Sequence, residues 1–166
     1  MPEEPDVMLG YMDIYHAAAI VEAISTWAGF EHAIDSLIWS LARLEPEQGA
    51  CLTAQFQGIT SRMDALISLA RVEHISEAHI TELNRLRSDL NGPREKRNRL
   101  VHDQWFYGAE SKRHYRLQVT ARGRLDHTYK LVTHEELAGI SEEFLALDER
   151  FHVIRSGVLS DFYASP

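Results

Sequence analysis

The chain has 166 residues, of which 45% are hydrophobic, so it can bury one substantial core but is too short for two ordinary domains. No window approaches the roughly 18 to 20 consecutive apolar residues of a membrane span, and the acidic start of the chain differs from the basic start of a secretory signal. We therefore expect an acidic N-terminal tail over residues 1–10, a single helical domain over 11–160, a C-terminal tail over 161–166, a cytoplasmic location and no membrane contact.

The net charge of −8 is distributed unevenly along the chain. The segment from Arg85 to Lys130 holds twelve of the 17 basic residues and five of the 25 acidic residues, an excess of seven positive charges. A negative protein repels polyanions, whereas a basic zone attracts phosphate, so this segment is the candidate surface for a polyanionic partner. The alternative is that these side chains are ordinary solvated arginines.

Apolar residues at alternating spacings of three and four predict the helices of the first half of the chain. They predict a long helix over about 11–44 and a second helix over about 46–70, which opens at a proline. A third helix follows a serine N-cap and extends over about 76–90. Pro93 fits the first turn of a renewed short helix over about 93–104.

The second half of the chain begins with a change of period. Alternation of apolar and polar residues predicts a two-stranded hairpin over about 113–132, whose loop carries Arg122 and Arg124. A capping box at 133–136 then opens a long last helix. The expected fold class is all-α, an antiparallel four- to five-helix bundle with a small inserted β-hairpin before the last long helix.

The stretch Arg97-Asn98-Arg99-Leu100-Val101-His102 lies on the predicted short helix. Arginine offers a planar fork of donors for phosphate, and histidine, with an ordinary pKa of roughly 6.5, transfers protons near neutral pH. On an ideal helix Arg97 and His102 are about 140° apart and do not share a face. Asn98 and His102 lie one turn apart, and Arg94 lies one turn before Asn98.

A structural interpretation of the same residues is also open. Extrapolation of the preceding apolar stripe places Arg97 near the core, where its guanidinium needs an acid. Glu31 and Asp35, one turn apart on the first helix, are the expected supporting acids. The sequence contains no glycine-rich phosphate loop, nucleophile elbow or standard spacing of metal ligands, so we expect no metal and no cofactor.

An arginine, a polar residue and a histidine after four intervening residues resemble the motif of the HEPN superfamily, matched here at Arg97, Asn98 and His102. The helical bundle, with the motif late in its third helical segment, also resembles that family over about residues 11–160. The resemblance implies a homodimer whose two motifs face each other across a groove, often as a metal-independent ribonuclease. A toxin or defence role of this kind would bring in a neutralising protein partner.

The resemblance also implies roles for these residues. His102 would be the general acid or base, Arg97 would stabilise the phosphate as charge develops, and Asn98 would orient His102 or contact the phosphate. Flanking phosphates would be bound by Arg94, Lys96, Arg99, Arg122 and Arg124. Two other hypotheses stay open: a catalytically inactive HEPN-like dimer that binds RNA, a nucleotide or a protein partner, and a purely structural helical adaptor.

Overall fold

The computed structural model describes residues 7–9, 12–120 and 126–164, so Arg122 and Arg124 lie outside the described residues. Its helices are α1 (Ile14–Leu41), α2 (Pro46–Thr53), α3 (Ile59–Val72), α4 (Glu77–Asp89), α5 (Asn91–His102) and α6 (His134–Ala164). Its strands are β1 (Val7–Leu9), β2 (Gln104–Gly108), β3 (Arg113–Thr120) and β4 (Asp126–Val132). The mainly helical class is thus confirmed. No helix within these ranges has the length and apolar character to cross a membrane.

The chain separates into two compact units. Unit 1 consists of Met1–Ser25 and Glu95–Glu142, and unit 2 consists of Thr26–Arg94 and Glu143–Pro166. Unit 1 contains the whole sheet, the start of α1, most of α5 and the start of α6. Unit 2 contains α2, α3, α4 and the remaining parts of α1 and α6.

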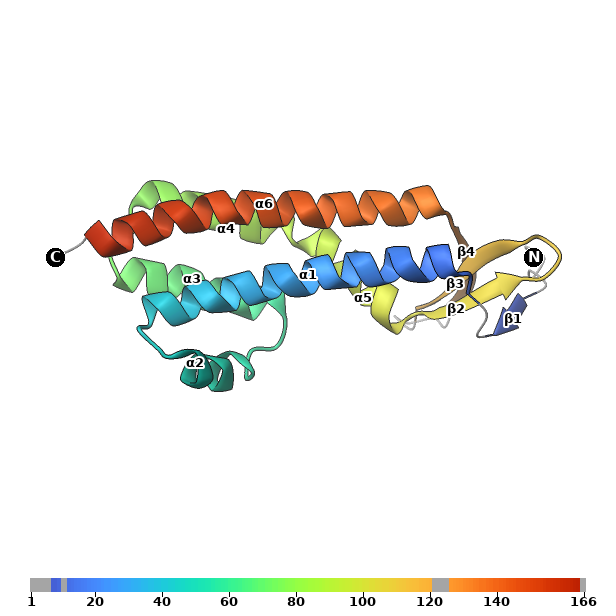
Figure 1. Ribbon diagram of the computed structural model, residues 1–166, viewed down its shortest axis with the longest axis horizontal. Helices are drawn as coiled ribbons and strands as arrows, with labels where there is room; N and C mark the ends of the chain where they lie inside the picture. Colours follow the sequence, from blue (N-terminus) through green and yellow to red (C-terminus); the bar gives the residue numbers. More distant parts are fainter. Residues whose placement is uncertain (1–6, 10–11, 121–125, 165–166) are drawn as a thin grey trace. The chain divides into compact units, whose positions relative to one another are not determined.

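Aromatic contacts in unit 2 give the relative direction of α1 and α6. Trp27 packs on Phe144, with ring centroids 4.9 Å apart, and Phe30 packs on Phe151 at 5.8 Å. All four rings are fully buried, and the contacts advance along both helices in the same sense. The α1 and α6 segments of unit 2 are therefore parallel (Figure 1). The expected all-antiparallel bundle is corrected to a mixed arrangement.

The cause of the mixed arrangement is a break in the second predicted helix, which forms α2 and α3 instead of one continuous element. Gly58 caps α3 with φ of 84°, a left-handed conformation that glycine adopts without steric cost. The connection through α2 lets α3 run parallel to α1, as shown by the successive ion pairs Asp35–Arg62 and Arg43–Glu73. Two later reversals, into α4 and into α6, then make α6 parallel to α1.

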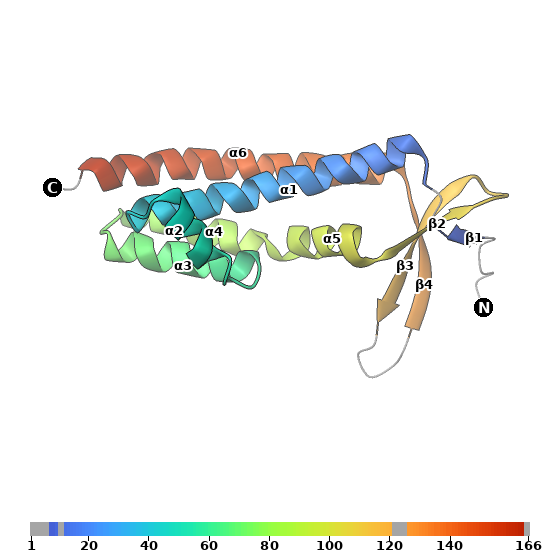
Figure 2. The same ribbon diagram turned by 60° about the horizontal axis from the view of Figure 1, so that its bottom comes forward.

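Unit 1 contains a four-stranded antiparallel sheet in the order β1-β2-β3-β4. The predicted hairpin is present as β3 and β4, which lie side by side in Figure 2, with Tyr115 opposite Leu131. The sheet is larger than expected because β2 also pairs with β3, placing Phe106 opposite Tyr115. The aromatic run in β2 favours strand, so α5 ends at His102 and not at Gln104.

Two segments expected as tails take part in regular structure. Val7–Leu9 forms β1, which pairs with β2. At the other end, α6 continues to Ala164, with Phe162 buried and the carboxylate of Asp161 accepting the backbone N–H of Ser76 at 3.1 Å. Regular secondary structure among the described residues thus extends beyond residues 11–160 at both ends.

Candidate functional site

The motif residues Arg97, Asn98 and His102 occupy the last turns of α5, in unit 1. Asn98 and His102 are exposed, and Arg97 is half-buried. The Nη1 group of Arg97 donates to Oδ1 of Asn98 at 3.2 Å. Among the described residues of unit 1, no carboxylate forms an ion pair with Arg97, and its buried Nε has no hydrogen-bond partner. The guanidinium therefore retains donor capacity and a positive charge that no carboxylate among the described residues of unit 1 neutralises.

One of the two acids expected to support Arg97, Asp35, has another partner. Asp35 binds Arg62 within unit 2, with Oδ1 and Nε 2.9 Å apart and both side chains largely buried. Burial raises the pKa of Asp35, an effect that the charge of Arg62 opposes and the nearby charge of Glu31 reinforces. The apolar stripe continues across the junction between α4 and α5, where Leu90, Pro93 and Leu100 are buried and Arg97 is half-buried. The expected pairing of Asp35 with Arg97 is corrected, because Asp35 is engaged by Arg62.

The cations expected to grip flanking phosphates differ in their surroundings. Arg99 is held by Glu95 at 3.3 Å and by Asp103 at 3.4 Å, so its charge is already compensated by carboxylates. Arg94 belongs to unit 2, where it donates to a threonine hydroxyl of α3 at 3.1 Å. Lys96 is exposed on α5. Arg97 is therefore the motif arginine whose charge is best placed to meet a phosphate.

A buried charge network fixes the end of α5 that carries His102. Oδ2 of Asp103 lies 3.4 Å from Nε of Arg116 on β3. Arg116 is buried, with 6% of its surface exposed. Burial lowers the pKa of Arg116, whereas the charge of Asp103 opposes this effect. The indole Nε1 of Trp105 donates to the carbonyl of Leu100 at 3.3 Å and satisfies a free acceptor of the last helical turn. The sheet thereby holds the motif in a defined position.

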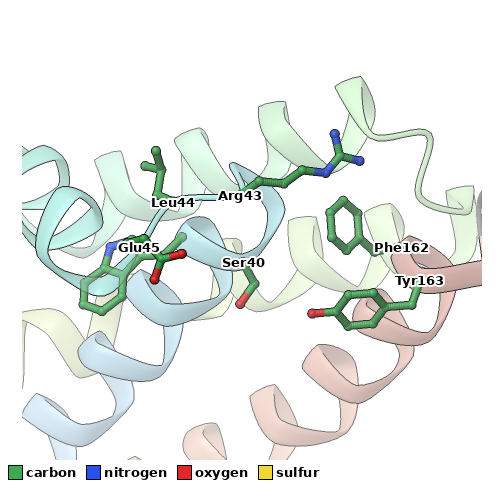
Figure 3. Close-up of a pocket in the computed structure, with 7 residues that line it drawn as sticks. Ser40, Arg43, Leu44, Glu45, Phe162 and Tyr163 are labelled. Atoms are coloured by element: carbon green, nitrogen blue, oxygen red, sulfur yellow. The ribbon is translucent and has the colours of Figure 1, made fainter.

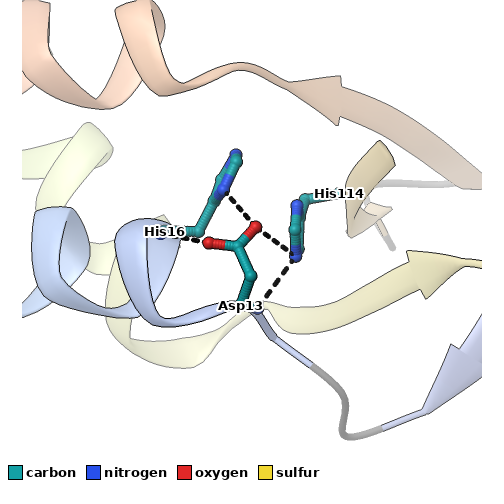
Figure 4. A group of neighbouring side chains, drawn as sticks. All are labelled: Asp13, His16 and His114. Atoms are coloured by element: carbon teal, nitrogen blue, oxygen red, sulfur yellow. Dashed lines mark hydrogen bonds and ion pairs between the residues drawn. The ribbon is translucent and has the colours of Figure 1, made fainter. Parts of the chain in front are cut away.

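A second cluster in unit 1 consists of Asp13, His16 and His114 (Figure 4). Asp13 caps α1, because its Oδ1 accepts the backbone N–H groups of Tyr15 at 2.8 Å and His16 at 3.0 Å. The bond from the His16 N–H is the main reason why the pKa of Asp13 is lowered. The other carboxylate oxygen, Oδ2, lies 2.9 Å from Nδ1 of His16 and 3.4 Å from Nε2 of His114.

His114 is the most enclosed member of this cluster, with 3% of its surface exposed. Its Nε2 accepts the backbone N–H of Asp13 at 3.2 Å, and its ring stacks on His16 with centroids 3.9 Å apart. Burial lowers the pKa of His114, and the neighbouring His16 adds to this effect. The cluster opens into a pocket of about 360 Å³ whose lining also includes Lys112, Arg113, Leu131, Val132, Thr133 and His134.

A third feature is a pocket of about 500 Å³ in unit 2, shown in Figure 3. It is lined by Trp39, Ser40, Arg43, Leu44, Glu45, Phe162 and Tyr163. The guanidinium carbon of Arg43 lies 5.1 Å from the centroid of the Phe162 ring, a cation–π contact, and Arg43 also binds Glu73. Because its arginine is already engaged, this pocket is a weaker site for an anion than Arg97 of unit 1.

The sequence offered little sign of the Asp13, His16 and His114 cluster. Asp13 and His16 have the spacing of one helical turn, which is a weak signal shared by many capped helices. His114 joins them only because β3 is paired into the sheet beside the start of α1. No standard metal or catalytic spacing connects these three positions.

Comparisons of the chain with models of known protein families, with curated proteins and with solved structures found no match. Function therefore has to be argued from the residues themselves. The resemblance to HEPN proteins remains a prediction carried by Arg97, Asn98 and His102 within a mainly helical fold.

Proposed function

We propose that the protein is a HEPN-like, metal-independent endoribonuclease that acts as a homodimer. The observation that supports this proposal is the environment of Arg97, which is bonded to Asn98 and forms no ion pair among the described residues of unit 1. A guanidinium of this kind suits a phosphate, because its planar fork can donate two parallel charge-assisted hydrogen bonds. The exposed His102 on the same helix supplies a group for proton transfer.

In the proposed reaction, His102 accepts the proton of a ribose 2′-hydroxyl, whose oxygen attacks the adjacent phosphorus. The bond from phosphorus to the 5′-oxygen breaks, and a protonated histidine returns a proton to that oxygen. The products are a 2′,3′-cyclic phosphate and a 5′-hydroxyl. Arg97 stabilises the negative charge that develops on the phosphate oxygens, and Asn98 holds the guanidinium in place.

The proposal requires a second copy of the chain. Residues five positions apart on an α-helix diverge by about 140°, so one copy of α5 presents Arg97 and His102 in different directions. In a twofold-symmetric dimer, each surface patch meets its own copy, and Arg97 of one protomer then faces His102 of the other. Two composite sites would form in one groove.

Binding without cleavage is the competing function. It is favoured by the absence of any hydrogen bond between Arg97 and His102 among the described residues. A protein of this kind would hold RNA or a nucleotide through Arg97 and the exposed Lys96 without transferring a proton. The two functions predict the same affinity for RNA but different chemistry.

The test is cleavage of a labelled RNA oligonucleotide by the purified protein in the presence of a chelator. We expect cleavage by the wild type, a loss of about 10²–10⁴-fold in His102→Ala, and a loss of about 10²–10³-fold in Arg97→Ala. The matched controls His152→Ala and Arg71→Ala replace exposed residues of α6 and α3 and should cleave at the wild-type rate.

Binding of the same RNA, measured by fluorescence anisotropy, separates the two functions. His102→Ala should bind RNA about as tightly as the wild type, because the exposed imidazole acts in proton transfer. Wild-type protein that binds RNA and leaves it intact supports the binding function. Cleavage that persists in folded His102→Ala contradicts the assigned role of this residue.

A further inference from the structure

We propose that Asp13, His16 and His114 form a binding site for a divalent transition-metal ion, with Zn²⁺ the best-suited ion. The three residues lie in unit 1, at the start of α1 and on β3. The inference goes beyond the proposed ribonuclease activity and does not depend on it, because the motif on α5 is expected to work without metal.

The donor atoms already have spacings close to those of a metal site. One oxygen and two imidazole nitrogens lie within 4.8 Å of one another, and Oδ2 of Asp13 is 2.9 Å and 3.4 Å from the two nitrogens. In a tetrahedral zinc site with bonds of about 2.0–2.1 Å, adjacent ligand atoms are separated by about 3.3 Å. Small movements of the side chains would therefore place a zinc ion between them.

The hydrogen bonds of His114 leave two acceptors facing each other. Because Nε2 of His114 accepts the backbone N–H of Asp13, this nitrogen carries a lone pair and no proton. It lies 3.4 Å from Oδ2 of Asp13, which also carries lone pairs. The single lone pair of Nε2 is directed at the Asp13 N–H, so a bound metal would take this lone pair in place of that hydrogen bond and would bridge Nε2 and Oδ2. Figure 4 shows both imidazoles approaching the same carboxylate oxygen.

The surroundings hold the ligands in position. The two backbone N–H groups bonded to Oδ1 fix the orientation of the Asp13 carboxylate, as outer-shell hydrogen bonds do in metal sites. His114 is enclosed by the sheet and cannot turn away into solvent. Metal binding would require two rearrangements. The Asp13 N–H would release Nε2 of His114, and the stacked rings of His16 and His114, now 3.9 Å apart and inclined by 27°, would open around the ion.

The fourth coordination position would open into the pocket of about 360 Å³. Three protein ligands with one open position are typical of zinc sites that exchange water or substrate, whereas structural sites are closed by four protein ligands. His134 stands near this opening, with its ring 6.0 Å from that of His16. Two nitrogen donors and one oxygen favour a transition metal over Ca²⁺ or Mg²⁺, which prefer oxygen ligands.

The test is titration of tag-free, chelator-treated protein with Zn²⁺ by isothermal titration calorimetry, and with Co²⁺ by its visible absorption. We expect one ion per chain. Asp13→Asn retains an amide oxygen for the helix cap and removes the charged ligand, and His16→Ala removes an imidazole that is only half-buried. Both variants should lose at least about 100-fold in affinity, since even the loss of an outer-shell partner costs 10–100-fold.

The control His152→Ala removes an exposed histidine of α6 and should bind zinc as the wild type does. His114→Ala removes a buried ring, so the fold of this variant is checked by circular dichroism. If His114→Ala does not fold, Asp13→Asn and His16→Ala decide the result. The proposal would be overturned if the wild type did not bind zinc. It would also be overturned if Asp13→Asn and His16→Ala bound zinc with the wild-type affinity. Because RNA cleavage is measured in chelator, failure of either proposal can be recognised separately.

Discussion

Replacement of Asp103 by asparagine should destabilise the protein through the network that holds the end of α5. The Asp103 carboxylate lies 3.4 Å from Arg99 and 3.4 Å from Arg116, and the Arg116 side chain is 8% exposed. Breaking a buried ion pair costs about 3–5 kcal/mol, because it leaves a charge buried without its partner. Nε of Arg116 has no aligned hydrogen bond, and the Asp103 side chain is 16% exposed, so we expect a loss of about 2–4 kcal/mol.

A matched control is present on the same helix. Glu95 pairs with the same Arg99, but its side chain is 69% exposed, so Glu95→Gln should cost about 0.3–0.5 kcal/mol. Urea denaturation gives the free energy of unfolding of both variants. The double variant Asp103→Asn/Arg116→Met should recover much of the loss, because it removes both buried charges. Equal losses in the two single variants, or no recovery in the double variant, would refute this reasoning.

Three further predictions concern stability and RNA binding. Gly157→Ala should lower the free energy of unfolding by about 1–3 kcal/mol, because the added carbon meets the ring of His79, which is held by Asp161 at 2.8 Å. The control Gly139→Ala, whose added carbon has no atom within 4 Å, should raise the free energy of unfolding by about 0.5–1 kcal/mol in the same urea assay. Hydrogen bonds from His79 and Ser76 lower the pKa of Asp161 to about 2. The charged Asp161 carboxylate therefore stabilises the fold fully at pH values above its ordinary pKa of 3.8, and this stabilisation is lost as the pH falls through 2. Asp161→Asn should therefore lower the melting temperature near pH 6, and the difference from the wild type should shrink below pH 4 and vanish only below pH 2. A difference that is independent of pH would contradict this account. Arg97→Ala should reduce the slope of log affinity for single-stranded RNA against log salt by about 0.7, the value for one phosphate contact, and an unchanged slope would show that Arg97 meets no phosphate.

The sequence predicted α1 and α6 well because both have a long apolar stripe. The break at Gly58 was missed, since apolar residues on both sides of it keep the helical spacing. The parallel direction of α1 and α6 depends on that break, and periodicity carries no information about direction. Strand β1 has three residues, too few to show a period of two, and the aromatic run of β2 favours a strand without identifying β3 as its partner.

The candidate site was predicted in part. The motif Arg97, Asn98 and His102 lies on a helix as expected, because Pro93 fits its first turn. The partner of Asp35 could not be predicted, because Arg62 comes beside it only when the break at Gly58 lets α3 run parallel to α1. The cluster of Asp13, His16 and His114 required the pairing of the sheet, which brings together residues about 100 positions apart.

The most direct test of the central claim is RNA cleavage by mixed dimers, measured in chelator. Arg97→Ala and His102→Ala should each be inactive alone. After they are mixed in equal amounts and allowed to exchange protomers, half of the dimers would carry one intact composite site, so about a quarter of the wild-type activity should return. If the mixture stays inactive although the protomers exchange, or if His102→Ala cleaves RNA by itself, the proposed shared site is contradicted.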